Sequence, residues 1–125
     1  MNNKFDLPGQ FDIDFKTLIG FEYSFLFQIK NENDDSFIII CYIDGKDNIV
    51  LKNNNSEISL NLYVERDVFH NMLLTIKNGI NMNIDDNNYE CDIRSLGVDF
   101  NDCFILKPIA DKKTGISIRN FSEKQ

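Results

Sequence analysis

Residues 37–43 read Phe-Ile-Ile-Ile-Cys-Tyr-Ile, an unbroken run of seven apolar side chains. A short run that is apolar on both faces is typical of a central β-strand covered on both sides. Before it, Phe21, Tyr23, Phe25, Phe27 and Ile29 alternate with other residues, which is the period of a strand with one buried face. After it, Asp44-Gly45 is a hairpin-turn signal, and residues 48–52 return as a third strand. The sequence therefore predicts an antiparallel meander on which the remaining chain packs.

Period-two alternation recurs along most of the chain, and turn residues separate the alternating stretches. Further strands are expected at residues 11–15, 58–64, 80–84, 89–93, 103–106 and 116–121. For residues 11–18 a helix ended by Gly20 is the competing interpretation. Pro108 cannot donate a hydrogen bond to a sheet, so a strand there is expected to end or to lie at an edge.

One segment, residues 67–78, has the period of a helix. Asp67 is suited to cap its start, Lys77 complements its dipole in the last turn, and Gly79 fits its C-terminal end. An apolar stripe at helical spacing supports this interpretation: Val68, Phe69, Met72, Leu73 and Ile76. The alternative is a strand that continues from residue 58 through 76, because Val, Phe, Thr and Ile are also tolerated in strands.

These elements predict an α+β class: a mostly antiparallel twisted β-sheet or sandwich of seven to nine short strands with one packed α-helix at about 67–78. The length of 125 residues favours a single domain over residues 1–125, with polar termini at 1–10 and 122–125.

The charge balance favours some partners over others. Lys and Arg number 13 and Asp and Glu number 20, so the net charge is −7. Such a surface repels phosphate backbones, which argues against direct nucleic-acid binding. It keeps the protein soluble, and it also suits a basic protein partner.

Three cysteines, Cys41, Cys91 and Cys103, give no paired disulfide framework. The first residues form no apolar leader, and the longest apolar run has seven residues, far short of the ~20 that span a bilayer. We therefore expect a cytoplasmic protein that does not bind membranes.

No motif for catalysis or for a cofactor is apparent. His70 is the only histidine and has no orienting partner at a recognisable spacing, and on a helix it would face solvent. The acidic stretch 83–90 lacks the residue order of a calcium loop and is expected to be a hairpin turn. Cys91 and Cys103 lack an activating environment in sequence. We expect no enzyme activity, no cofactor and no metal.

The remaining interpretation is a small acidic binding module. In general character the chain resembles bacterial immunity proteins, which implies an inhibitor or antitoxin that masks a basic toxin or a nuclease-like enzyme. Acids near turns and on exposed strand faces are the candidate partner-binding residues. They are Asp12, Asp14, Glu57, Glu65, Asp85, Asp86, Glu90, Asp92, Asp99 and Asp102.

The alternative function is a structural or accessory module of a phage, virion or secretion system that self-associates into a homo-oligomer. An enzyme or a small-ligand carrier is the weakest hypothesis, because the many Phe residues are more simply explained as core.

Overall fold

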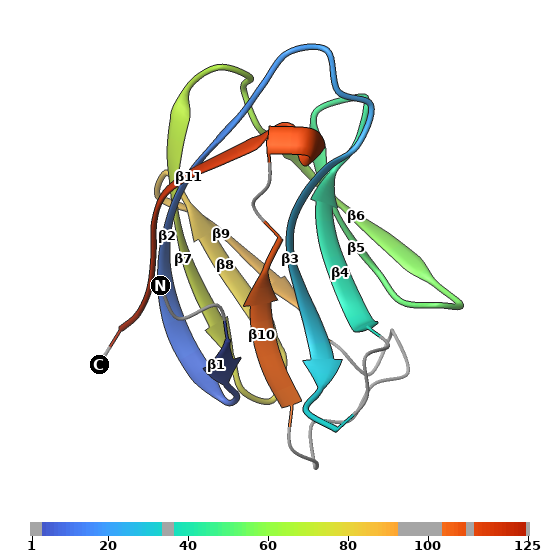
Figure 1. Cartoon of the computed structure of the whole chain (residues 1–125), viewed down its shortest axis with the longest axis vertical. Coiled ribbons are helices and arrows are strands. Elements are labelled where there is room, and N and C mark those ends of the chain that lie inside the picture. Colours follow the sequence, from blue (N-terminus) through green and yellow to red (C-terminus); the bar gives the residue numbers. More distant parts are fainter. Residues whose placement is uncertain (1–3, 34–36, 93–103, 110–111, 125) are drawn as a thin grey trace.

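Two antiparallel β-sheets pack face to face (Figure 1). The fold comes from a computed structural model that describes residues 4–33, 37–92, 104–109 and 112–124. One sheet has six strands in the order β1-β10-β3-β4-β5-β6, and the other has five in the order β11-β2-β7-β8-β9. The strand bounds are β1 Phe5–Asp6, β2 Gly9–Thr17, β3 Ser24–Asn31, β4 Phe37–Ile43, β5 Asn48–Lys52, β6 Glu57–Tyr63, β7 Phe69–Ile76, β8 Ile80–Ile84, β9 Asn87–Cys91, β10 Phe104–Pro108 and β11 Ile116–Glu123.

The predicted meander is present in the six-stranded sheet. The stretch 37–43 is β4, which pairs with β3 on one side and with β5 on the other. Ile39, Cys41 and Ile43 are fully buried toward the other sheet. Tyr42 belongs to the opposite, outer face, yet it is only 6% exposed. The apolar character of both faces of β4 therefore has two separate causes, the core on one side and a covered outer face on the other.

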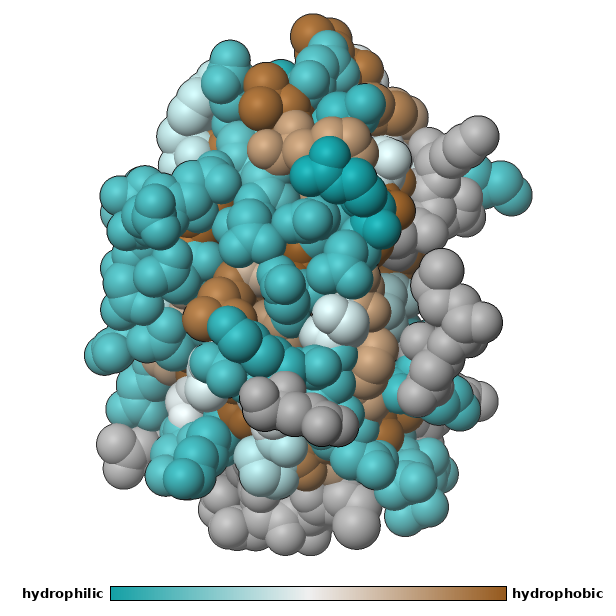
Figure 2. Space-filling view, turned by 90° about the vertical axis from the view of Figure 1, so that its left-hand side faces the viewer, coloured by the Kyte–Doolittle hydropathy of each residue, from teal (hydrophilic) through white to brown (hydrophobic). Residues whose placement is uncertain are grey.

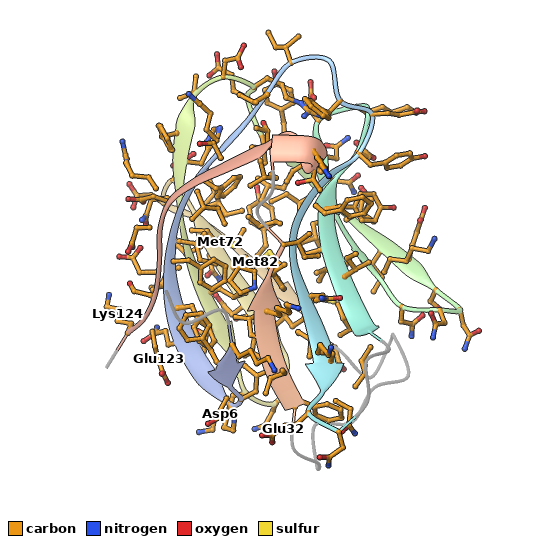
Figure 3. All side chains as sticks on the ribbon, in the orientation of Figure 1. Asp6, Glu32, Met72, Met82, Glu123 and Lys124 are labelled. Atoms are coloured by element: carbon orange, nitrogen blue, oxygen red, sulfur yellow. The ribbon has the colours of Figure 1, made fainter. Side chains whose placement is uncertain are left out.

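The core lies between the two sheets and is formed by alternate residues of each strand. In the five-stranded sheet, Phe11, Ile13 and Phe15 of β2 are fully buried beside Met72 and Leu74 of β7. Figure 3 shows Met72 and Met82 pointing into the space between the sheets. Strand β2 spans residues 9–17, so the helical interpretation of residues 11–18 is wrong.

The predicted helix at 67–78 is also wrong, and with it the α+β class. Residues 69–76 form β7, which pairs with β2 and β8 in the middle of the five-stranded sheet. The described part of the chain contains no α-helix, only a 3₁₀ turn at Lys112–Thr114. His70, Met72, Leu74 and Ile76 are buried at alternate positions. Asp67 sits in a turn with φ of 60° and does not cap a helix.

A β-bulge changes the predicted burial of residues 21–29. The pairing of β3 with β4 shifts register between Phe25 and Phe27, so one extra residue is accommodated. Leu26 and Phe27 are consequently both buried, whereas Phe25 and Tyr23 belong to the outer face. The strict alternation in the sequence therefore does not correspond to one buried face.

Three connections lie together at one end of the sandwich. The β2–β3 loop, the β4–β5 turn and the β6–β7 loop lie at the upper end in Figure 1, and Glu32, after β3, lies at the lower end in Figure 3.

No helix with the length and apolar character needed to cross a membrane occurs in the part of the chain that the structure describes.

Candidate functional site

Aromatic side chains cluster on the outer face of the six-stranded sheet. The ring centroid of Tyr42 on β4 lies 5.7 Å from the ring centroid of Tyr23, in an edge-to-face arrangement, and 5.8 Å from the ring centroid of Phe25. These spacings are within the range in which aromatic pairs attract one another. Tyr42 and Val50, which face each other across β4 and β5, are buried without belonging to the core between the sheets. The outer face thus has a small apolar floor of its own.

Polar side chains border this floor along β5 and β6. Tyr42 Oη donates a hydrogen bond to Glu57 Oε2 at 3.1 Å, across the intervening strand β5. Lys52 lies directly opposite Glu57 in the register of β5 with β6, and Ser59 lies opposite Val50. Lys52, Glu57 and Ser59 are all exposed. Burial, with the hydrogen bond and negative charge of Glu57, raises the pKa of Tyr42 to about 12, so its hydroxyl is a donor at neutral pH.

At the upper end of the sandwich the surface is hollowed. The hollow has a volume of about 710 Å³ and is formed by the β2–β3 loop, the β4–β5 turn and the chain that follows β6. We call it the end hollow, and its lining residues are Ile19, Gly20, Phe21, Glu22, Gly45, Asp47, Tyr63, Glu65 and Arg66. Tyr63 is the last residue of β6 and is strongly exposed, so it belongs to both the outer face and the end hollow.

Arg66 holds the segments around the end hollow together. Its side chain is only 10% exposed, and each of its five N–H donors has an acceptor within reach. Nε donates to Asp47 Oδ1 (2.6 Å), Nη1 to the Leu18 carbonyl (3.1 Å) and Ser24 Oγ (2.8 Å), and Nη2 to the carbonyls of Phe21 (3.2 Å) and Asp44 (3.1 Å). One guanidinium therefore links the β2–β3 loop to the β4–β5 turn, while its own backbone follows β6.

His70 is buried on β7, contrary to the solvent-facing position expected on a helix. Its Nδ1 lies 2.5 Å from Asp85 Oδ2 and its Nε2 lies 2.7 Å from the Glu65 carbonyl oxygen. Asp85 occupies the β8–β9 turn and also accepts from the Asn71 amide. The histidine thus connects the loop after β6 to the β8–β9 hairpin, which is a structural role.

The outer face of the five-stranded sheet is polar and internally bonded. Asn71 Nδ2 donates to Asp12 Oδ1 at 2.7 Å and to Asp14 Oδ1 at 2.8 Å, across the β2–β7 pairing. Arg119 and Lys16 both lie over the ring of Phe69, at 4.1 and 5.0 Å from its centroid. The polar groups of this face largely bind one another.

The predicted partner-binding acids do not form one surface. Asp85 and Asp86 make the two-residue β8–β9 turn, both with positive φ, and Glu90 on β9 accepts a hydrogen bond from Asn81. Glu57 lies on the other sheet, and Glu65 lines the end hollow. Asp92 directly follows β9, whereas Asp99 and Asp102 lie outside the described residues.

Two of the three cysteines lie within the described residues. Cys41 is fully buried, and burial raises the pKa of its thiol, which disfavours the reactive thiolate. Cys91 is partly buried and forms no disulfide, and Cys103 falls outside the described ranges. Among the residues that the structure describes, no three His, Cys, Asp or Glu side chains are grouped as metal ligands.

Comparison with solved structures assigns the architecture. Xenopus laevis galectin-Ib superposes with a TM-score of 0.69 at 14% identity, covering 99% of this chain and 97% of that one. Chicken galectin 2 gives 0.66 at 14% identity, covering 98% and 95%. CG-16, a homodimeric agglutinin from chicken liver, gives 0.66 at 8% identity, covering 96% and 95%. The chain has a galectin-like fold. No family model matches the sequence, and no curated protein does so.

These comparisons overturn the function predicted from the sequence. The similar structures are galectins and an agglutinin, not immunity proteins, inhibitors or antitoxins, and a basic toxin or nuclease-like partner has no support among them. The alternative of a phage, virion or secretion-system module has none either. The error arose because net charge and size are shared by many unrelated folds and do not specify a partner.

Sequence reasoning missed Tyr42 and Arg66, which organise the two candidate surfaces, and it assigned Glu57 to a basic protein partner. Tyr42 and Glu57 are 15 positions apart, and Arg66 bonds to residues up to 48 positions away. The only available signal was the presence of a tyrosine inside an otherwise strongly apolar strand. A single Arg between strands in an acidic chain gives no indication of burial.

Proposed function

We propose that this chain is a carbohydrate-binding module without enzyme activity, and that its ligand lies on the outer face of the six-stranded sheet over β4, β5 and β6. The observation that carries the proposal is the Tyr42–Glu57 pair, placed between an aromatic floor and exposed polar residues on a galectin-like sandwich. The names galectin and agglutinin denote carbohydrate-binding lectins, which gives the fold-level support.

The chemistry of this face suits a sugar. A pyranose presents apolar C–H groups on its ring faces and hydroxyl groups at its edges, so it needs an aromatic or apolar contact together with fixed donors and acceptors. Glu57 keeps one carboxylate oxygen beyond the Tyr42 bond, Lys52 offers three donors, and Ser59 both donates and accepts. Exposed Tyr63 and Tyr23 supply ring surface at the same end of these strands.

A glycan array followed by calorimetry on the strongest ligand tests this proposal. We expect Glu57→Gln and Lys52→Met each to weaken binding by about 1–2 kcal/mol, roughly 5- to 30-fold, because each removes a charged hydrogen-bonding group. Glu90→Gln is the matched control, an exposed glutamate on the other sheet, and it is expected to leave affinity unchanged. Equal effects of Glu57→Gln and Glu90→Gln, or no glycan bound at all, would refute the proposal.

Two further properties remain predictions for this chain. Homo-oligomerisation fits the description of CG-16 as homodimeric, and light scattering after size exclusion measures it directly. A cytoplasmic location is consistent with the buried free thiol of Cys41, and fluorescence of a tagged protein in the source cell tests it.

A further inference from the structure

Exposed large hydrophobic side chains gather at one end of the molecule. Four such residues are found among the described positions, and all four lie in or beside the loops of the upper end. They are Ile19 (72% exposed), Tyr63 (64%), Tyr23 (51%) and Val68 (43%). Figure 2 shows brown, hydrophobic atoms at this end of the face it presents, and further brown atoms between the teal residues below. Ile19 and Tyr63 also line the end hollow, so the apolar surface continues into a concave site.

The end hollow carries a net negative charge that the one cation of its lining compensates only in part. Glu22, Glu65 and Asp47 are its carboxylates, and Arg66 is its only cation among the lining residues. Arg66 donates to Asp47 and has no free N–H, so it cannot also serve Glu22 or Glu65. The side chains of Glu22 and Glu65 have no hydrogen-bond or ion-pair partner within the described part of the chain.

We propose that the end hollow is a subsite for a cationic sugar, a hexosamine with a free ammonium group, and this inference rests on the carbohydrate-binding function proposed above. The ammonium group would lie between the Glu22 and Glu65 carboxylates. The sugar ring would contact Tyr63, which ends β6 and lines the hollow.

Continuity with the outer face favours a sugar over an isolated cation. Tyr63 pairs with Asn48 at the start of β5, so an oligosaccharide along β4 to β6 would extend past Tyr63 into the end hollow. The lining is mixed, with Ile19 and Phe21 beside the carboxylates, which suits the C–H groups of a sugar ring as well as its charge. Arg66 keeps the loop and turn that form the walls in place, so little ordering is needed on binding.

Paired oligosaccharides that differ only in charge provide the test. Binding of a β-1,4-linked glucosamine tetramer and of its N-acetylated counterpart is measured by calorimetry at mildly acidic pH, where the free amines are protonated. We expect the charged tetramer to bind roughly 3- to 10-fold more tightly, the range of one or two exposed ion pairs, with a preference that falls as salt rises. The double variant Glu22→Gln/Glu65→Gln should abolish the preference. Glu32→Gln, an exposed glutamate at the opposite end, is the matched control (Figure 3).

The outcomes separate this inference from the proposed function. Equal affinity for the two tetramers, or a preference that survives Glu22→Gln/Glu65→Gln, refutes the cationic subsite while neutral glycan binding through Glu57 still stands. If a tetralysine peptide binds as tightly as the charged tetramer, the choice of a sugar is refuted. Charged-tetramer binding that is insensitive to Glu57→Gln and Lys52→Met but lost in Glu22→Gln/Glu65→Gln supports the subsite and refutes the outer face.

Discussion

Replacing Arg66 by methionine should strongly destabilise the protein. Methionine keeps an unbranched apolar stem but removes all five donors. Asp47, Ser24 and three backbone carbonyls then lose their partner at once. The acceptors are part-buried, so their desolvation is no longer offset by a protein hydrogen bond.

The size of the effect follows from these contacts. The charged bond to Asp47 is worth about 1.5–3 kcal/mol, and each bond to a neutral acceptor is worth about 0.5–1.5 kcal/mol. The end hollow admits water, which recovers part of the loss, so we expect a decrease of about 3–4 kcal/mol in the free energy of unfolding, close to the cost of breaking a buried ion pair. That is a large share of a typical domain's stability of roughly 5–15 kcal/mol.

Urea unfolding followed by circular dichroism measures this loss. Arg119→Met is the matched control, because Arg119 is 60% exposed and its nitrogen lies 3.7 Å from Asp14, a weak pair worth below about 1 kcal/mol. Arg66→Lys retains the charge but not the planar fork, and should restore less than half of the loss. Hydrogen exchange of the Leu18 and Val64 amides, which bond to Gly115 and Asp47, should accelerate locally.

If Arg66→Met and Arg119→Met cost the same, the guanidinium does not hold the loops together. A large loss of unfolding free energy with no local change in the hydrogen-exchange protection of the Leu18 and Val64 amides would also contradict the reasoning. It would show that Arg66 does not act at the β2–β3 loop and the β4–β5 turn.

Two further predictions concern the same end of the sandwich. The folded-state pKa of Tyr42 is raised to about 12 from an ordinary value of 10.0, so its contribution to stability is fully present below pH 10 and is lost as the pH rises toward 12. Tyr42→Phe should therefore flatten the alkaline decline of the melting temperature, and an unchanged slope would exclude Tyr42 as its source. Gly115 has φ of 72°, and an added Cβ would lie 2.5 Å from the Phe21 ring, so Gly115→Ala should cost roughly 2–4 kcal/mol of unfolding free energy. Gly20 has φ of 98° and open space around it, so Gly20→Ala should cost only about 1 kcal/mol. Equal losses in urea titrations would show that the Phe21 ring moves aside at no cost in free energy.

The segment 69–76 shows why periodicity predicted most strands but not this one. Its buried positions are His70, Met72, Leu74 and Ile76, whereas Phe69 and Leu73 on the opposite face are half-buried. Apolar residues on both faces satisfy a helical stripe and a strand equally well. Pairing with β2 and β8 decides between them, and that tertiary information is absent from local sequence. The stretch 37–43 escaped this ambiguity because it is uniformly apolar, contains four isoleucines, which are β-branched, and is bounded by turn residues.

The candidate sites were less predictable than the strands. Tyr42 meets Glu57 only because β4, β5 and β6 are adjacent in a particular register. A shift of one residue in either pairing would turn one of the two side chains toward the core. Net charge indicated that acids are abundant but could not indicate which of them lack partners, which depends on the position of Arg66 and Asn71.

The two outer faces differ in how much hydrogen-bonding capacity they leave for a ligand. On the five-stranded sheet, Asn71 already bridges Asp12 and Asp14, so a ligand there must first break protein hydrogen bonds that are nearly equal in strength to those it forms. On the six-stranded sheet, Lys52 has no partner within the described residues, and the carboxylate of Glu57 has one oxygen left over. Binding there replaces hydrogen bonds to water and does not require these side chains to break hydrogen bonds within the described part of the protein. The same reasoning applies at the end hollow, where Arg66 is fully bonded and the neighbouring carboxylates are not. The surfaces that can bind a ligand at least cost are therefore contiguous, and they meet at Tyr63.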